Sequence, residues 1–362
     1  MNSFRNSYSN VRASFHSMPT ILDLRDILGI RPINTGRQHY LFGPAGLVTD
    51  DLEGLHAVCD EQGRTRLVSG TEFAMQMYRG QTQEHTPCLP ALGRKSNVEE
   101  QLLALCRNIA FEDCIADHPF VQLAEKSNFL GYPLYVDREG LGQHYGRPTN
   151  MLDVTCNFDV ASFFATCAWN NELRQYVPMC DTRLHGVIYR LTPMLLFDPS
   201  VPDRPCGPFH IVGWQPLPRP EQQRAFVIRM KPGQDFGAIP SVECFRFRHS
   251  ARVSNRIWRS FDEGRELFPA DAAAELAVRA EALHQFTPHQ IERAWERLEQ
   301  WTEKTFCTEE RLAINERSGL VEVSETMLGW GGLDVETDKD RLFEKLRDVL
   351  SRVRYRRAMY LG

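Results

Sequence analysis

A group of polar side chains precedes an apolar segment near the middle of the chain. Residues 143–165 read QHYGRPTNMLDVTCNFDVASFFA, and the apolar part is expected to be a helix capped by Asn157 or Asp159. His144 could shuttle a proton, because imidazole has the side-chain pKa nearest to neutrality. Asp153 could place a negative charge beside a developing cation. The segment therefore predicts a binding or catalytic site.

A structural interpretation of the same residues stays open. His144 and Tyr145 would then fill hydrogen-bonded core positions, and Asp153 and Thr155 would only cap the following helix. Residue types alone do not separate this buried network from a site.

A second stretch that could do chemistry lies upstream, where residues 75–94 read MQMYRGQTQEHTPCLPALGR. Arg79 ends an apolar run and Gly80 follows it directly, which places a guanidinium on the last residue of an expected strand. A glycine lets a ligand approach the backbone closely, and a guanidinium can hold a phosphate through two hydrogen bonds. Arg79 is therefore the predicted phosphate-binding residue.

The chain that must position these residues has an ordinary globular composition. It has 362 residues, 42% of them hydrophobic and 25% charged, and its net charge of −5 gives no global attraction to nucleic acid. No apolar run is long enough to span a bilayer, and the first 20 residues lack the continuous apolar run of a secretory signal. The ten cysteines include no C-x-x-C pair. This pattern indicates reduced thiols, a cytoplasmic location and no metal site.

The pattern of apolar residues predicts an α+β fold with a mixed or antiparallel central sheet, followed by a helical C-terminal unit. Residues 1–20 are expected to form a mobile arm, residues 21–250 the α+β domain and residues 251–362 the helical region. Within the helical region, Thr287, Pro288 and Gln290 supply the N-cap, first-turn proline and capping-box partner of one helix. A basic run at the end of the last helix is interpreted as a solvated helix end: Arg352, Arg354, Arg356 and Arg357.

Several spaced motifs together resemble the FRG domain, a family named after its Phe/Tyr-Arg-Gly start. They are YRGQ at 78–81, LGR at 92–94, Glu100, QHYGRPTNMLDVT at 143–155, and the later PLPRPEQQRAFVIRM, in which Gln222 and Phe226 match. The resemblance covers roughly Phe73 to Phe247. Family members often have Arg at the position of Asn150, Trp at Val154 and Gly at Arg224. If the missing Arg contacts phosphate, Arg147 would have to replace it.

A weaker similarity to ADP-ribosyltransferases implies a reaction. The order of a strand Arg-Gly, a Thr-bearing segment and a late Gln or Glu implies that Arg79 orients NAD, Thr155 supports the nicotinamide pocket and Gln222 fixes the ribose or the acceptor. His144 and Tyr145 would stack on nicotinamide or shuttle a proton, and Asp153 would supply charge. Glu221 competes with Gln222, because strand alternation would turn only one of them to the pocket.

The same similarity implies NAD as the substrate, with no metal. The further residues expected to bind it are Tyr78, Gly80, Gln81, Gln143, Gly146, Arg147 and Thr149.

Three functions remain open on the sequence. The first is an NAD-consuming ADP-ribosyltransferase or glycohydrolase, acting on a protein or nucleic-acid acceptor as a toxin or antiphage effector, with the helical third as its partner or sensor region. The second is a non-catalytic module that binds a nucleotide or nucleic acid in the same pocket. The third is a structural protein in which the polar group is only a core network.

Other catalytic classes have no motif in the sequence. It contains no G-x-S-x-G, H-E-x-x-H or P-loop, and no G-x-G-x-x-G in a βαβ setting. Cys167 is expected to lie within the apolar helix VASFFATCAW, which predicts a buried, inert thiol. Cys156 has no positive neighbour in the sequence that would lower its pKa.

Overall fold

The computed structural model describes residues 18–30, 55–60, 62–69, 76–181, 183–192 and 208–354. Most of the predicted arm, the start of the motif region at Phe73, and Arg356 and Arg357 lie outside these residues.

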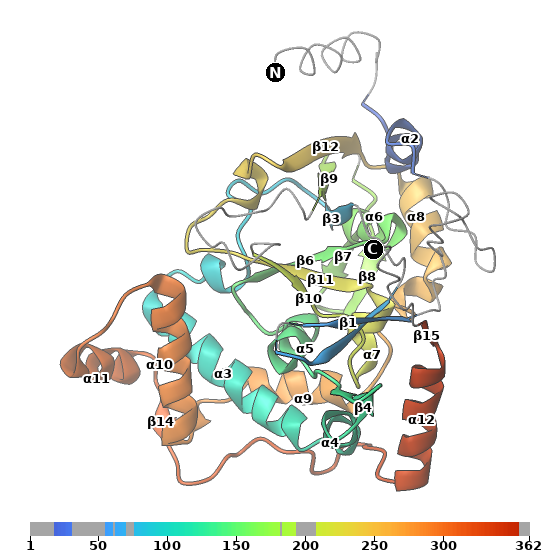
Figure 1. The fold of residues 1–362 in the computed structure, drawn as a ribbon. Helices are drawn as coiled ribbons and strands as arrows, with labels where there is room; N and C mark the ends of the chain where they lie inside the picture. Colours follow the sequence, from blue (N-terminus) through green and yellow to red (C-terminus); the bar gives the residue numbers. More distant parts are fainter. Residues whose placement is uncertain are drawn as a thin grey trace, which may run out of the picture.

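A six-stranded sheet forms the centre of the molecule (Figure 1). Its neighbouring strands are antiparallel, in the order β10-β11-β6-β3-β9-β12. The bounds are Phe209–Ile211 for β10, Ala225–Arg229 for β11, Met151–Thr155 for β6, Met77–Gln81 for β3, His185–Leu191 for β9 and Val242–Arg248 for β12. The predicted α+β fold is confirmed, with an antiparallel main sheet.

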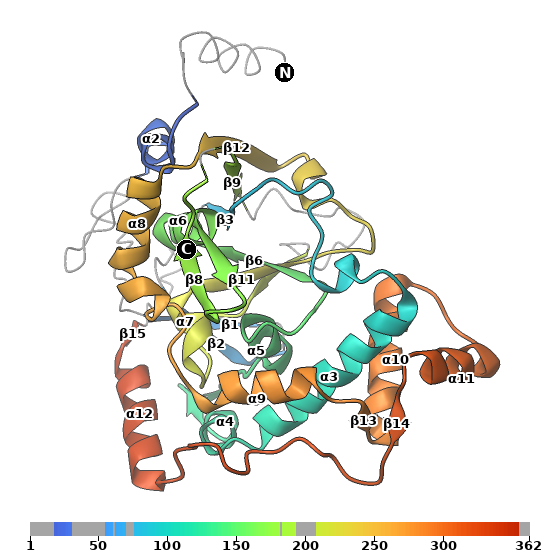
Figure 2. The same ribbon diagram turned by 180° about the vertical axis from the view of Figure 1, so that it is seen from behind.

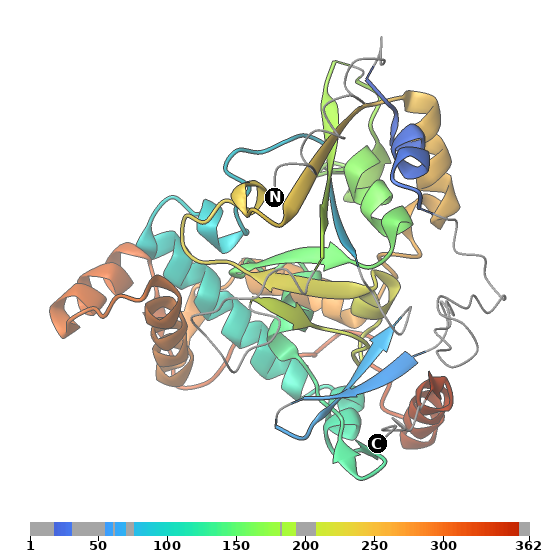
Figure 3. The same cartoon turned by 45° about the horizontal axis from the view of Figure 1, so that its top comes forward.

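The sheet is split between β3 and β6. In the described chain these two strands meet at a single residue pair, Tyr78 with Thr155, whereas β3 and β9 share five pairs. Figure 3 shows β6 and β11 running across the direction of β3 and β9. Because the hydrogen-bonded ladder stops after one pair, the two halves of the sheet diverge, and side chains from both strands can face the space between them.

Helix α6 (Phe158–Thr166) packs against β3 at close range. Its N-cap is Asn157, whose side chain accepts hydrogen bonds from the backbone N–H of Asp159 and Val160, so Asn157 is the cap among the two predicted candidates. A Cβ on Gly80 would lie 1.9 Å from the carbonyl oxygen of Ala161. Glycine at this position is therefore required by the contact between helix and strand.

An antiparallel hairpin continues directly from α6. Its strands are β7 (Cys167–Asn170) and β8 (Gln175–Pro178), and helix α8 (Ala251–Ser260) packs on α6 beside it. Cys167 thus begins a strand, although the apolar run VASFFATCAW predicts that it lies within the helix.

Helices from before and after residue 250 pack together in one hydrophobic core, separate from the contact between α6 and the main sheet. They are α3 (Val98–Ala116), α5 (Arg138–His144), α9 (Ala272–Glu281), α10 (Pro288–Thr302) and α12 (Lys339–Ser351), and Figure 2 shows α9 and α10 beside α3. Arg297 of α10 donates two hydrogen bonds to the Glu112 carboxylate of α3, at 2.6 and 2.7 Å. The capping box of Thr287 and Gln290 is present at the start of α10, as predicted. The domain boundary near residue 250 stays a prediction.

A small sheet of order β15-β1-β2 joins the C-terminal end of the described chain to residues 55–69. Strand β15 (Val353–Arg354) is parallel to β1 (Leu55–Cys59), which is antiparallel to β2 (Thr65–Ser69). Arg352, just before β15, forms an ion pair with Glu221 at 2.6 Å. The end of the last helix is therefore tied to the body of the protein, although it was predicted to be solvated.

The remaining elements are short. They are α2 (Ile21–Ile27), α4 (Pro119–Glu125), β4 (Asn128–Phe129), β5 (Tyr132–Pro133), α7 (Pro218–Gln222), β13 (Gln285–Phe286), α11 (Thr308–Arg317) and β14 (Val321–Glu322), with 3-10 turns at Leu92–Arg94, Phe236–Ala238 and Asp262–Gly264. Among the described helices, none combines the length and the apolar character needed to cross a membrane.

Candidate functional site

A pocket of about 340 Å³ lies at the split between β3 and β6. This volume is near the lower end of the range of about 300–1,000 Å³ typical of small-molecule sites. One part of its wall is polar and another is aromatic. The polar part includes Arg79, Gln81, His144, Asp153, Thr155 and Gln223, and the aromatic part includes Tyr78, Phe164, Trp169 and Tyr176.

Arg79 spans the split in the sheet. It lies on β3, and its Nη1 donates a hydrogen bond of 2.8 Å to the backbone carbonyl of Asp153 on β6. Because β3 and β6 no longer pair at Arg79, its side chain makes the hydrogen bond to β6 that a continuous ladder would have made through the backbone. The Arg79 Nε is buried and has no hydrogen-bond partner in the described chain. The guanidinium is thus held in place with donor capacity left for a ligand.

Asp153 presents one occupied and one unoccupied carboxylate oxygen. Its Oδ2 accepts a hydrogen bond of 3.0 Å from Gln143 Nε2, and Gln143 Oε1 in turn accepts from the Thr149 hydroxyl. Its Oδ1 is buried without a hydrogen bond among the described residues, and lies 3.7 Å from His144 Nε2. These hydrogen bonds, from Thr149 through Gln143 to Asp153, therefore hold the carboxylate in place and leave its Oδ1 available.

His144, the last residue of α5, is held in place by a contact at its Nδ1 atom. Its Nδ1 lies 2.9 Å from Gln223 Oε1, and Gln223 Nε2 donates to the carbonyl of Leu267 at 3.0 Å. The His144 side chain is only 1% exposed. Its Nε2, on the opposite side of the ring, has no hydrogen bond within the described residues.

Trp169 and Tyr176 form the aromatic part of the wall together with Tyr78 and Phe164. Trp169 of β7 is half-exposed, and its ring centroid lies 5.3 Å from that of Tyr176 on β8. Tyr176 also stacks on Phe268 at 4.7 Å. Burial, followed by the negative charge of Asp153, raises the pKa of Tyr176 to about 12, so the phenol is neutral at physiological pH. The pocket therefore has flat aromatic surface as well as polar groups in its wall, which suits an aromatic ring of a ligand.

A second guanidinium lies close to Arg79. Burial, followed by the positive charge of Arg79, lowers the pKa of Arg94. In the described parts of the chain, the Arg94 guanidinium has no hydrogen bond or ion pair. A buried guanidinium close to a second positive charge favours an anionic ligand.

Neither a thiol nucleophile nor a metal centre is indicated here. Cys167 lines the pocket, but burial raises its pKa to about 12, so it is protonated at neutral pH, in agreement with the inert thiol predicted from the sequence. The described residues contain no group of three or more metal-binding side chains.

The structure brings together four of the six residues predicted to be catalytic, and three of those predicted to bind the ligand. The seven that line the pocket are Arg79, His144, Asp153, Thr155, Tyr78, Gly80 and Gln81. The role proposed for Gly80 needs correction, because the space beside it is occupied by the backbone of Ala161.

Tyr145 does not line the pocket, although the sequence placed it there. Its hydroxyl donates to Asp271 Oδ2 at 2.7 Å, and its ring packs near Phe111 in the helical core. Tyr145 follows the last residue of α5, so its side chain leaves the helix in a different direction from that of His144.

Gln222 is exposed and also lies outside the pocket lining. The prediction assumed the alternation of a strand at Glu221 and Gln222. Instead, residues 218–222 form the helix α7, and β11 begins only at Ala225. Glu221, the other candidate, is paired with Arg352. The residue that faces the pocket is Gln223.

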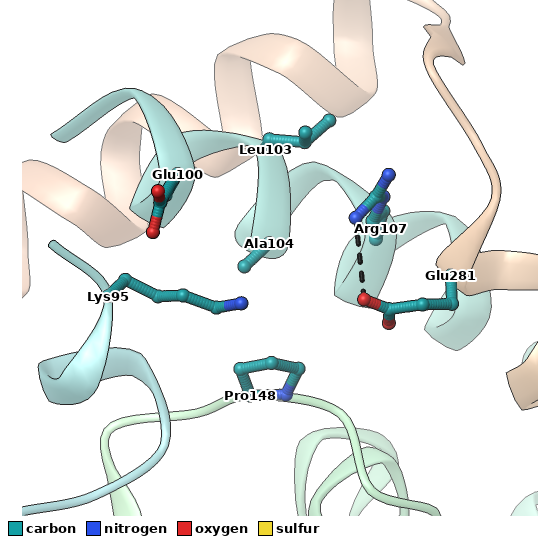
Figure 4. Close-up of a pocket in the computed structure, with 7 residues that line it drawn as sticks. All are labelled: Lys95, Glu100, Leu103, Ala104, Arg107, Pro148 and Glu281. Atoms are coloured by element: carbon teal, nitrogen blue, oxygen red, sulfur yellow. Dashed lines mark hydrogen bonds and ion pairs between the residues drawn. The ribbon is translucent and has the colours of Figure 1, made fainter. Parts of the chain in front are cut away.

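The remaining predicted residues support the site from outside or lie apart from it. Gln143 and Thr149 anchor Asp153, and Gly146 has a φ of +78°, a conformation that favours glycine in the turn after α5. Arg147 is buried and pairs with Glu281 at 2.8 Å, so it does not replace the missing family arginine in this pocket. Figure 4 shows a second cavity, of about 70 Å³, where Glu281 also contacts Arg107.

The sequence interpretation missed Gln223 and the aromatic wall. The signal for Gln223 was a proline at each of residues 218 and 220, which favours a short helix before the strand. The signal for the wall was the alternation of Trp169 and Tyr176 around the polar turn NNELRQ, which is typical of a hairpin.

Comparison with known proteins gives one match. Residues 74–173 match the family model described as the FRG domain. This range contains Arg79, His144, Asp153 and Trp169, whereas Gln223 lies beyond it. No curated protein and no solved structure shows significant similarity to the chain.

Proposed function

This chain contains an FRG domain, and from the pocket of that domain we propose that it binds NAD and cleaves the bond between nicotinamide and ribose, by ADP-ribosyl transfer or by hydrolysis. One observation carries the proposal: three buried polar atoms that have no hydrogen-bond partner among the described residues, Arg79 Nε, His144 Nε2 and Asp153 Oδ1, belong to residues that line one pocket. Buried polar groups are nearly always hydrogen-bonded, so such a group of exceptions at a cavity indicates a ligand.

The chemistry of the wall fits the parts of NAD. Arg79, with Arg94 close by, suits the pyrophosphate, and the surface of Trp169 and Tyr176 suits the nicotinamide ring. As the bond from ribose C1′ to the nicotinamide nitrogen breaks, its electron pair leaves with nicotinamide and positive charge develops on the ribose. The Asp153 carboxylate would stabilise that charge. Water or an acceptor hydroxyl then attacks C1′ and gives up its proton.

Release of nicotinamide tests the proposal directly. We expect purified protein incubated with NAD to release nicotinamide, and Arg79→Ala to reduce the rate by about a hundredfold or more, because both the charge and the donors of the guanidinium are lost. Arg79→Lys keeps the charge without the planar fork and should lose most of this activity as well. Thermal melts of both variants serve as the folding control. Full nicotinamide release by folded Arg79→Ala would exclude the proposed role of this residue.

A non-catalytic nucleotide-binding module is the second candidate, and one observation favours it. Asp153 is the single carboxylate in the lining of the described pocket, because Glu221 points to Arg352. If NAD binds to the protein and no nicotinamide is released, with or without candidate acceptors, this second function stands and the enzymatic one is rejected.

The biological setting is part of the proposal. We propose a cytoplasmic effector, a toxin or a factor in antiphage defence, whose helices after residue 251 contact a protein partner or a sensor ligand. Support comes from the described cysteines, all of which are free thiols, as a reducing compartment favours. The acceptor is a protein or a nucleic acid if the reaction is a transfer.

A further inference from the structure

The orientation of the Gln223 amide follows from its two partners. The Leu267 carbonyl can only accept a hydrogen bond, so the amide nitrogen must face it, at 3.0 Å. The amide oxygen of Gln223 then faces His144 Nδ1, at 2.9 Å. Because an amide oxygen can only accept, His144 Nδ1 must carry a proton.

This arrangement determines what the other ring nitrogen can do. A neutral imidazole has one proton, and with that proton on Nδ1 the Nε2 atom is a hydrogen-bond acceptor. Facing it at 3.7 Å is Asp153 Oδ1, which is also an acceptor and, like Nε2, has no partner in the described chain. The separation exceeds that of a hydrogen bond. Two buried acceptors thus lie side by side with no donor between them.

The pair specifies the chemistry of its ligand. It needs two donors on neighbouring atoms, and a vicinal diol provides them, whereas phosphate and carboxylate groups offer acceptors only. A metal ion is disfavoured, because these are two potential ligands and the described residues form no group of three. We propose that His144 Nε2 and Asp153 Oδ1 accept hydrogen bonds from the vicinal diol of a ribose, and that Gln223 is the positioning residue that keeps Nε2 an acceptor. The ribose identity rests on the proposed function.

Binding of NAD analogues to the unmodified protein tests the diol. Calorimetry would compare NAD with two 2′,3′-dideoxy analogues, one altered at the nicotinamide ribose and one at the adenosine ribose. We expect one of the two to bind about tenfold to a hundredfold more weakly than NAD, because a hydrogen bond to a carboxylate and one to a buried ring nitrogen are lost. Equal affinity for all three compounds would overturn the diol and leave NAD binding intact. Absence of NAD binding would overturn both proposals.

The positioning role of Gln223 has its own test, which needs no ligand. In ¹⁵N NMR spectra at a pH where the ring is neutral, we expect the His144 signals, assigned by their loss in His144→Gln, to show the proton on Nδ1. A proton on Nε2 would overturn the proposal.

A substituted protein extends this test. In Gln223→Glu the carboxylate would favour a doubly protonated ring, so that Nε2 becomes a donor toward Asp153. The preference for NAD over the sensitive dideoxy analogue should then fall to about twofold or less. Gln222→Glu, the same change at the neighbouring exposed position, should retain the preference and serves as the matched control. Because Gln223→Glu could fail to fold, its melt is recorded, and the NMR result on the unmodified protein decides if it does.

Discussion

The described residues include two His–Asp pairs that differ in one respect. His210 and Asp137 lie 2.5 Å apart, and the second Asp137 oxygen accepts from the backbone N–H of Gly140, so this pair is closed. His144 and Asp153 lie 3.7 Å apart and leave Nε2 and Oδ1 without partners in the described chain, so this pair is open. Similar residues thus serve different purposes. A closed pair contributes to folding, and an open pair on a cavity retains its hydrogen-bonding capacity for a ligand.

The closed pair should give the largest effect on stability. Asp137→Ala removes a carboxylate whose side chain is 3% exposed and leaves His210 without its carboxylate partner, and it also removes the N-cap of α5. Arg66 loses one of its two carboxylates and keeps Asp60. We expect a loss of about 3–5 kcal/mol in the free energy of unfolding, measured by urea denaturation. A loss below about 1 kcal/mol would show that the pair is not the structural element described here.

The closed pair also predicts a dependence on pH. Burial would raise the pKa of Asp137, but the hydrogen bond and charge of His210, the hydrogen bond from Gly140 and the charge of Arg66 together outweigh it, and the pKa lies below its ordinary value of 3.8. Because the pKa is depressed in the folded state, the stabilisation is present above pH 3.8 and is lost as the pH falls through the folded value. The unfolding free energy of Asp137→Ala should therefore depend less on pH in this acid range than that of the unmodified protein.

The open pair should show a smaller effect, and on a different quantity. The Asp153 side chain is 43% exposed at the pocket, so Asp153→Ala should change the unfolding free energy by no more than about 1 kcal/mol. Its affinity for NAD should fall about tenfold to a hundredfold, as measured by calorimetry, because a charged acceptor is lost. If instead Asp153→Ala unfolds as readily as Asp137→Ala, the open pair belongs to the structural network considered from the sequence.

The smallest effect is expected at Tyr145, next to the open pair but turned away from it. Tyr145→Phe removes the hydrogen bond to Asp271 and should cost about 1 kcal/mol of unfolding free energy by urea denaturation. Nicotinamide release should be unchanged. If Tyr145→Phe lost nicotinamide release at normal stability, Tyr145 would have a role in the site, which would contradict the geometry described here.

The sequence predicted most of the site because its motifs lie on regular elements. Arg79 and Asp153 each lie in the middle of a strand, and both line the pocket. The prediction that Arg79 is the last residue of its strand was wrong, because β3 continues to Gln81. The wrong assignments concern residues at the end of an element, where a shift of one position decides which side chain faces the pocket. Helix α7 stops at Gln222, and Arg224 has a φ of +50°, so the chain turns sharply before β11 and it is Gln223 that faces His144. Such a step is set by backbone conformation, which residue types do not specify.

The aromatic wall was missed for a related reason. The run from Val160 to Trp169 is apolar except for Ser162 and Thr166, and helix and strand cannot be told apart there by periodicity. The chain changes from helix to strand between Thr166 and Cys167. This change places Trp169 and Tyr176 on a hairpin over the pocket. Tertiary packing therefore determines the part of the site that would contact an aromatic ring.

The parallel contact of β15 with β1 has a consequence for the order of events during synthesis. β1 is the middle strand of its sheet only when residues 353–354 are present, and until the ribosome has made them one side of β1 exposes unpaired backbone groups. Such an edge can pair with a strand of another molecule. The ion pair between Arg352 and Glu221 also cannot form until the same segment has been made. A chain that stops before Arg352 is therefore expected to associate with other copies during its synthesis, even though every residue of the pocket has already been made.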